Sequence, residues 1–169
     1  GLSQHDESEE LKILLKEGDE LLALNRRLMA QDKYLQMQEV TKKGQLYAQS
    51  EIRLAEIAYA DGEYHETLDR IEKLNSYELD VSTLKLKQKA LMQLEMNKEA
   101  LKLGEEIFLH LQDADTAAKN AILSARLRNE KAAIGWLKWL KNNSPDNFKL
   151  LSQHVDFDFL RSSQFFKDE

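Results

Sequence analysis

The side chains that could do acid–base, nucleophilic or metal chemistry are scattered along this sequence. It has four histidines and no cysteine, and no two histidines stand three or four residues apart. A zinc site on one helix would need that spacing. His65 lies between Glu63 and Glu66, a polar pattern typical of a solvated surface. We therefore expect no metal site and no cofactor.

The sequence also predicts no catalytic centre. Carboxylate pairs such as Glu9–Glu10 and Glu105–Glu106 are typical of a charged helix surface rather than of a paired acid and base. No serine or threonine has a neighbouring histidine–aspartate arrangement, and there is no glycine-rich phosphate loop. The prediction is a protein without enzymatic activity.

Composition and charge limit the class of partner. The chain has 169 residues, 42% of them hydrophobic and 32% charged, with a net charge of −6. This charge disfavours general binding to nucleic acid, and no apolar run approaches the roughly 20 residues of a membrane span. The chain begins at Gly1 without methionine. We therefore expect a processed or cloned fragment from which a targeting or anchoring segment could have been removed, and localisation stays open.

The elements that must position any site are predicted to be helices. Proline occurs once and glycine six times, and the apolar residues follow helical spacing. The first helix is expected over residues 8 to 30, capped by Ser8, with a break near Gln31-Asp32. Its apolar side would carry Leu11, Leu14, Leu15, Leu21, Leu22 and Leu28. A second helix would carry Tyr34, Met37 and Val40 and stop at Lys43-Gly44.

A pattern with a step of 33 residues follows. It starts in the stretch DGEYHETLDRIEKL, residues 61 to 74, where Asp61-Gly62 is a turn signal. Four positions stay small or apolar in three copies: Thr67, Ala100 and Ala133; Leu68, Leu101 and Ile134; Ile71, Gly104 and Leu137; Leu74, Ile107 and Leu140. The helices before them match less well, since Lys87 and Gln88 are polar where packing is expected. Such a period predicts stacked helical repeats.

This spacing resembles the tetratricopeptide repeat, a helix–turn–helix unit of about 34 residues. Gly62 and Tyr64 fit its turn and the start of its second helix, and Ala133, Leu137, Leu140 and Pro145 fit that helix in the third copy. The family's tryptophan and leucine–glycine pair are missing, and Thr67 and Gly104 are unusual at their positions.

The resemblance implies an all-α, right-handed superhelix that forms a single structural domain. Residues 1–47 would be N-terminal helices that form a degenerate first repeat. Three repeats would follow at 48–80, 81–113 and 114–147, and residues 148–169 would form a C-terminal cap. The tail VDFDFLRSSQFF resembles the segment that often closes bacterial arrays of this family. Phe157, Phe159, Leu160 and Phe165 would cover the apolar face of the last repeat.

The resemblance also implies a groove lined by the first helix of each repeat. Its binding residues would be Arg53, Glu56, Tyr59, Lys85, Leu86, Lys89, Met92, Lys119 and Arg126. Basic residues outnumber acidic ones at the inward positions, which favours an acidic or carboxylate-bearing peptide. The other interpretation is that these lysines and arginines are ordinary solvated groups. Trp136 and Trp139 are expected to pack inside the array, with contact to a partner as the alternative.

The function that follows is a non-catalytic protein–protein interaction scaffold that binds a peptide or partner domain in the groove. One alternative is a dimeric assembly module, in which the leucine-rich helix at residues 8 to 30 pairs with a copy of itself. Another is a regulatory domain of a larger protein. The expected partner is a protein or peptide, with no nucleic acid and no membrane insertion.

Overall fold

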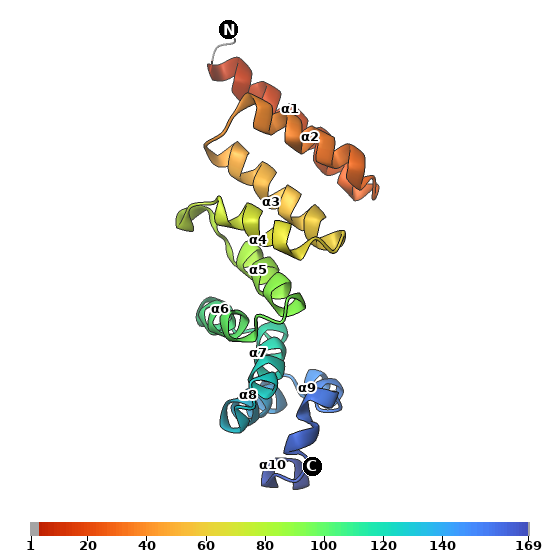
Figure 1. Cartoon of the computed structure of the whole chain (residues 1–169), viewed down its shortest axis with the longest axis vertical. Helices are drawn as coiled ribbons and strands as arrows, with labels where there is room; N and C mark the ends of the chain where they lie inside the picture. The colour runs from red at the N-terminus through yellow and green to blue at the C-terminus, as the bar shows by residue number, and fades with distance from the viewer. Residues whose placement is uncertain (1–3, 169) are drawn as a thin grey trace. The chain divides into compact units, whose positions relative to one another are not determined.

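The structure is a computed structural model that describes residues 4–168, which form helices and no strand (Figure 1). The elements are α1 (Gln4–Ala23), α2 (Arg27–Val40), α3 (Gln45–Ala60), α4 (Tyr64–Glu72), η1 (Ser76–Glu78), α5 (Val81–Gln93), α6 (Asn97–His110), α7 (Ala114–Arg126), α8 (Glu130–Asn143), α9 (Pro145–Leu151), η2 (Val155–Leu160) and α10 (Gln164–Lys167). The predicted all-α class is confirmed.

The chain divides into two compact units. The first ends at Thr83 and the second begins at Leu84, so the boundary lies inside α5. The sequence contains no linker at this point. A single structural domain over the whole chain therefore stays a prediction.

Four of the turns that connect successive helices have the same backbone geometry. Each has a residue in the left-handed region, namely Asn25 (φ 59°), Gly62 (φ 79°), Glu95 (φ 57°) and Arg128 (φ 59°). The next residue's N–H donates to a carbonyl five positions back, at 2.8–2.9 Å, as in Glu63 to Ala58 and Met96 to Leu91. This bond satisfies a helix-end carbonyl and reverses the chain. The turn signal at Asp61-Gly62 is therefore the first of three such turns spaced 33 residues apart.

The first turn lies earlier than predicted. The helix expected over residues 8 to 30 ends at Ala23, and Gln31-Asp32 lies inside α2. Asn25 adopts the left-handed conformation, and Arg26 N–H donates to the Leu21 carbonyl at 2.9 Å. Asparagine tolerates this conformation better than most residues, which explains the position of the turn. Leu28, expected on the apolar side, is 81% exposed.

The core of the first unit forms where α1, α2 and α3 meet. Its buried residues are Leu11, Leu14, Ala30, Tyr34, Met37, Leu54 and Ile57. The Tyr34 ring lies directly on Gly18, where a Cβ atom would stand 2.5 Å from Cε1. The Tyr34 hydroxyl donates to Asp19 Oδ1 at 2.6 Å. Burial, reinforced by this bond, raises the pKa of Tyr34 well above its usual value.

A buried carboxylate links three helices of the same unit. Glu51 on α3 is 1% exposed and accepts hydrogen bonds from Gln38 Nε2 at 2.7 Å and Tyr47 OH at 3.1 Å. Arg70 Nη1 on α4 pairs with Glu51 Oε2 at 3.2 Å. The charge is tolerated because a cation and several donors replace the water it loses.

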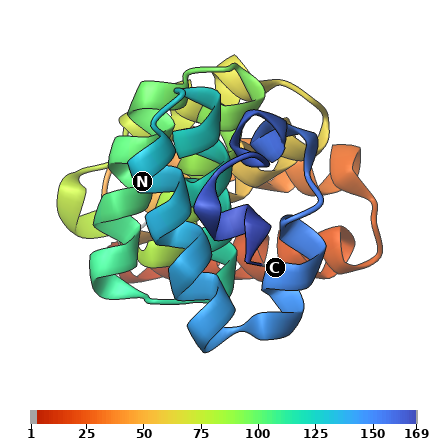
Figure 2. The same cartoon turned by 90° about the horizontal axis from the view of Figure 1, so that it is seen from below.

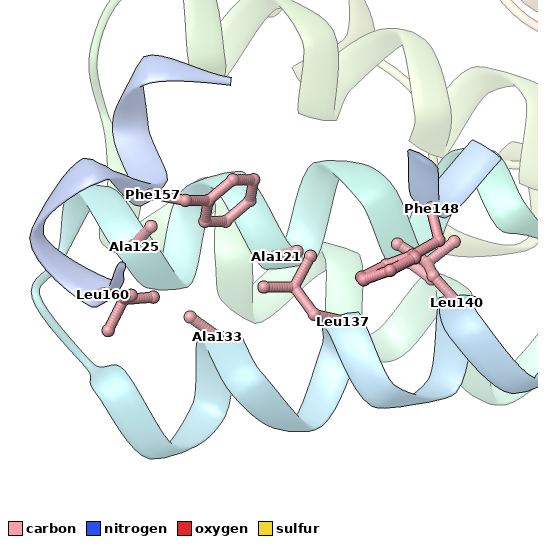
Figure 3. Close-up of a cluster of buried hydrophobic side chains, with 9 residues drawn as sticks. Ala121, Ala125, Ala133, Leu137, Leu140, Phe148, Phe157 and Leu160 are labelled. Carbon is pink, nitrogen blue, oxygen red and sulfur yellow. The ribbon is translucent and has the colours of Figure 1, made fainter. Parts of the chain in front are cut away.

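The core of the second unit lies between α7, α8 and the C-terminal segment (Figures 2 and 3). Phe157 and Leu160 of η2 are 0% and 1% exposed and pack over the alanines of α7 and α8, while Phe148 of α9 covers Leu140. Phe165 packs against the cluster, but Phe159 is not part of it and is 37% exposed.

Trp136 and Trp139 pack within the second unit. Both indole rings meet the Phe108 ring edge to face, with centroids at 4.8 and 5.1 Å. These contacts join α6 to α8, as the packing interpretation of the two tryptophans predicts.

Candidate functional site

Three predicted groove residues lie on α3 in the first unit. Arg53 is partly buried, and its Nε atom donates to Asp19 Oδ1 at 3.0 Å while its Nη1 atom lies 3.9 Å from Glu56. Burial opposes the charge of Arg53, but the bond to Asp19 outweighs it and raises the pKa. The Tyr59 ring contacts that of Tyr64, with centroids 5.3 Å apart. Arg53 is thus already committed to carboxylates of its own unit.

Lys85 and Lys119 form a network with two aspartates in the second unit. Lys85 Nζ, on α5, pairs with Asp113 and lies 3.4 Å from Asp115, which also pairs with Lys119. Burial would lower the pKa of Lys85, but the bonds to Asp113 and Asp115 raise it. Burial likewise opposes ionisation of both aspartates, yet their lysine partners lower their pKa values.

Arg126 ends α7 and pairs with the C-terminal segment, since its Nε atom lies 3.0 Å from Asp156 Oδ2. Leu86 on α5 is only 7% exposed and belongs to the interior. Met92, at the end of α5, is partly buried. Arg53, Lys85, Lys119 and Arg126 therefore each have a carboxylate partner.

The basic excess expected for the groove is reduced by these carboxylates. Asp19, Asp113 and Asp156 stand outside the inward positions that the sequence pattern assigned, so counting those positions missed them. Asp113 had a visible signal, because it precedes α7 and its side chain caps Thr116 N–H at 2.9 Å. Asp156 could be paired with Arg126 only once the fold was known.

The second unit has a cleft of about 850 Å³ that contains two of the predicted residues, Met92 and Arg126. It lies among the end of α5, the start of α6, the end of α7 and η2. We call it the turn cleft, and its lining is Met92, Gln93, Glu95, Asn97, Ala125, Arg126, Arg128, Val155, Asp156, Asp158 and Phe159. Sequence reasoning missed most of these residues, because the groove positions were assigned to helices and not to turns.

The turn cleft combines exposed apolar side chains with charged ones. Val155 is 69% exposed and Phe159 is 37% exposed. The Arg128 guanidinium lies over the Phe159 ring, 4.5 Å from its centroid. A buried Asn97 Oδ1 atom has no hydrogen-bond partner in the described part of the chain. Such a lining suits recognition of a chain segment that carries both apolar and polar groups.

Within residues 4–168, no group of three or more metal-ligating side chains could hold an ion. In the same part of the chain, no helix is long and apolar enough to cross a membrane.

Comparison with known proteins identifies the class of fold. No family model and no curated protein matches the sequence. Among solved structures the chain is similar to YrrB, described as a TPR protein with an unusual peptide-binding site, with a TM-score of 0.76 and 14% identity over 92% of this chain and 80% of that one. At this identity the likeness establishes the fold. The chain has the tetratricopeptide-repeat fold that its 33-residue pattern predicts.

Proposed function

We propose that this protein is a non-catalytic interaction scaffold that binds a peptide segment of a partner protein in the turn cleft. The observation that carries the proposal is the lining of the cleft, where exposed Val155 and Phe159 adjoin Met92 and charged side chains. Exposed apolar groups gathered in a concavity are typical of binding sites. The fold supports the same function, because the similar YrrB is described as having a peptide-binding site.

The predicted groove residues extend this site as a proposal. Met92 and Arg126 line the turn cleft itself. Lys89 on α5 and Lys119 on α7 would contact the part of the peptide that leaves the cleft. Since Lys119 and Arg126 already have carboxylate partners, we expect each to contribute little attraction. The same holds for Lys85. Arg53, Glu56 and Tyr59 lie in the first unit, and a peptide contact there stays a separate prediction.

Self-association is the second candidate, and one surface favours it. Around the α1–α2 turn, Leu24 is 65% exposed, Leu28 81% and Met29 53%. By contrast, Leu11 and Leu14 of the predicted pairing helix are buried inside the unit. A dimer would therefore use the turn and not the leucine-rich face. Light scattering on the wild type and on Leu28→Glu tests it. If the dimer is built on this turn, the solution mass should fall from that of a dimer to that of a monomer in the variant.

The test of the peptide scaffold uses display of a random peptide library, with selection on the immobilised chain. Selected peptides are then measured against Val155→Glu, which places a charge in the turn cleft. Leu109→Glu is the matched control, because Leu109 is 79% exposed on α6 and does not line the cleft. We expect binding to be lost in the first variant and kept in the second. Failure to select any peptide, or equal binding to both variants, would refute the proposal.

A further inference from the structure

Two charged residues occupy a backbone position that glycine occupies in the first of three successive turns. Gly62, Glu95 and Arg128 follow one another at the 33-residue step, and all three have positive φ. Glycine adopts this conformation freely, whereas a residue with a Cβ atom is strained there. Backbone strain of this kind is often kept where a side chain has a function. Glu95 and Arg128 both line the turn cleft.

Arg128 is the cation in this cleft that has no carboxylate partner among residues 4–168. Arg126 is neutralised by Asp156 at 3.0 Å, and Asp158 pairs with Arg161 at 3.1 Å. The structure gives Arg128 a different contact, the face of the Phe159 ring at 4.5 Å. This contact orients the guanidinium and leaves its charge uncancelled.

A guanidinium stacked on an aromatic ring keeps its N–H edge available. That edge carries parallel donors whose geometry matches a carboxylate, and such paired bonds are among the strong hydrogen bonds of proteins. Val155 and Phe159 would contact an apolar side chain next to the carboxylate. Glu95, which has no ion pair among the described residues, would repel an acidic group placed at its own end of the cleft.

We propose that Arg128 binds a carboxylate of the ligand peptide and that Glu95 fixes the direction in which the acidic residue is placed. The ligand would be an acidic segment in which Asp or Glu is adjacent to an apolar side chain. This inference rests on the proposed peptide-binding function and names the ligand class for the same cleft.

Arg128→Gly separates this role from a structural one. Glycine removes the backbone strain and also the contact with the Phe159 ring. These two effects are similar in size and opposite in sign, so the melting temperature of the variant is expected to change little. Binding should nevertheless fall about tenfold for peptides that carry the carboxylate, the usual effect of losing one charge-assisted contact of about 1.4 kcal/mol. The probes are the acidic peptides selected with the wild type, each also synthesised with Asp→Asn or Glu→Gln. The amide peptides should bind more weakly and be insensitive to Arg128→Gly.

Glu95→Gly is the matched control. It relaxes the same strain in the preceding turn and also removes a charge from the cleft. We expect a higher melting temperature and, because a repelling charge is removed from the cleft, stronger binding of the acidic peptides. Unchanged or weaker binding in this variant would contradict the assigned role of Glu95.

The outcomes distinguish a failure of this inference from a failure of the proposed peptide-binding function. If wild-type selection gives no peptide whose binding depends on Val155, the proposed function and this inference both fail. If such peptides are found, but the carboxylate-to-amide change and Arg128→Gly each alter affinity less than about twofold, the scaffold stands and the assignment of Arg128 is overturned.

Discussion

Gln88 on α5 donates a hydrogen bond to Asn120 on α7 at 3.1 Å, and the two side chains meet over Gly104 of α6. Both amides are buried, at 1% and 0% exposed. The same Gln88 Nε2 atom also donates to the Ala100 carbonyl at 3.2 Å. A Cβ atom on Gly104 would lie 1.9 Å from Asn120 Oδ1 and 2.3 Å from Gln88 Nε2. The glycine thus provides the space in which three helices are joined by one amide pair.

Gly104→Ala should destabilise the protein despite the better helix propensity of alanine. The new methyl group would overpack the site, at a cost of about 1–3 kcal/mol, and would separate two buried amides at a similar cost. Alanine regains only about 1 kcal/mol in a helix. We expect a net loss of about 2 kcal/mol in the free energy of unfolding, measured by urea denaturation.

Gly135→Ala is the matched control for Gly104→Ala. Gly135 lies within α8, and a Cβ atom added there would have no neighbour within 4 Å. Only the helix propensity then changes, so the variant should be more stable by about 0.5–1 kcal/mol. Equal effects of the two substitutions would show that the space above Gly104 is not needed.

These residues also show how far the sequence can be interpreted. Gln88 and Gly104 are exceptions to the repeat pattern, one polar and one small where apolar side chains are expected. Neither residue can be explained from the sequence around it. The hydrogen-bond partner of Gln88 is Asn120, which lies 32 residues further along the chain. The period predicts which helices stack, but the pairing of two amides depends on side-chain positions that only the folded packing determines.

Removing the glycine of one turn and introducing a glycine in the next should have opposite effects on stability. Gly62→Ala forces a Cβ atom into a positive φ of 79°, with nothing within 4 Å to clash with it. The expected loss is therefore backbone strain alone, about 1 kcal/mol. Glu95→Gly relieves the same strain and should gain about 0.5 kcal/mol, because the added freedom of the unfolded chain offsets part of the relief. Thermal unfolding of both variants measures the contrast.

Two phenylalanines of the C-terminal segment should differ in how much stability is lost when each is replaced by alanine. Phe157 is 0% exposed in the core, so Phe157→Ala should cost about 3–5 kcal/mol and promote aggregation. Phe159, at 37% exposed, loses mainly its contact with Arg128, worth about 0.5–1 kcal/mol. Denaturation curves that rank the two variants the other way would contradict the assignment of Phe157 to the core and Phe159 to the cleft.

The sequence pattern alone could not tell that Phe157 is buried and Phe159 is exposed. The tail reads VDFDFL, and both residues fit the expected cap equally well. The residues lie in a 3-10 helix, Val155–Leu160, where side chains three apart share a face. Phe157 and Leu160 therefore point into the core together, and Phe159 is left outside. Knowing that the tail is helical and not extended is what resolves the choice.

The buried carboxylate of the first unit should depend on its cation. Arg70→Met would leave Glu51 buried without its main partner, and breaking a buried pair in this way costs about 3–5 kcal/mol. Lys73 lies 3.9 Å from Glu51 and offsets part of the loss, so we expect about 3 kcal/mol. Adding Glu51→Gln to Arg70→Met should restore part of the stability, because a neutral amide needs no cation. A double variant no more stable than Arg70→Met would show that the charge of Glu51 is not what Arg70 compensates.

Asp113 combines a helix cap with an ion pair, and two substitutions separate these roles. Asp113→Asn keeps a side chain able to cap α7 and loses the charge that pairs with Lys85. That partly buried pair should be worth about 1 kcal/mol or less at pH 7. Asp113→Ala removes the cap as well, at a further cost of about 1 kcal/mol. Urea denaturation at pH 7 should therefore rank the wild type first, Asp113→Asn second and Asp113→Ala last.

Acid should remove the difference in the free energy of unfolding between the wild type and Asp113→Asn. Burial opposes ionisation of Asp113, but its bonds to Lys85 and Thr116 outweigh it and hold the pKa below the ordinary 3.8. A carboxyl with a depressed folded pKa stabilises the protein fully above its unfolded value, and the effect is lost as pH falls through the folded value. The gap between the two proteins should stay constant from pH 7 to about 5 and close below about pH 4. A gap that persists in acid would mean that hydrogen bonding at the cap, and not the charge on Asp113, accounts for it.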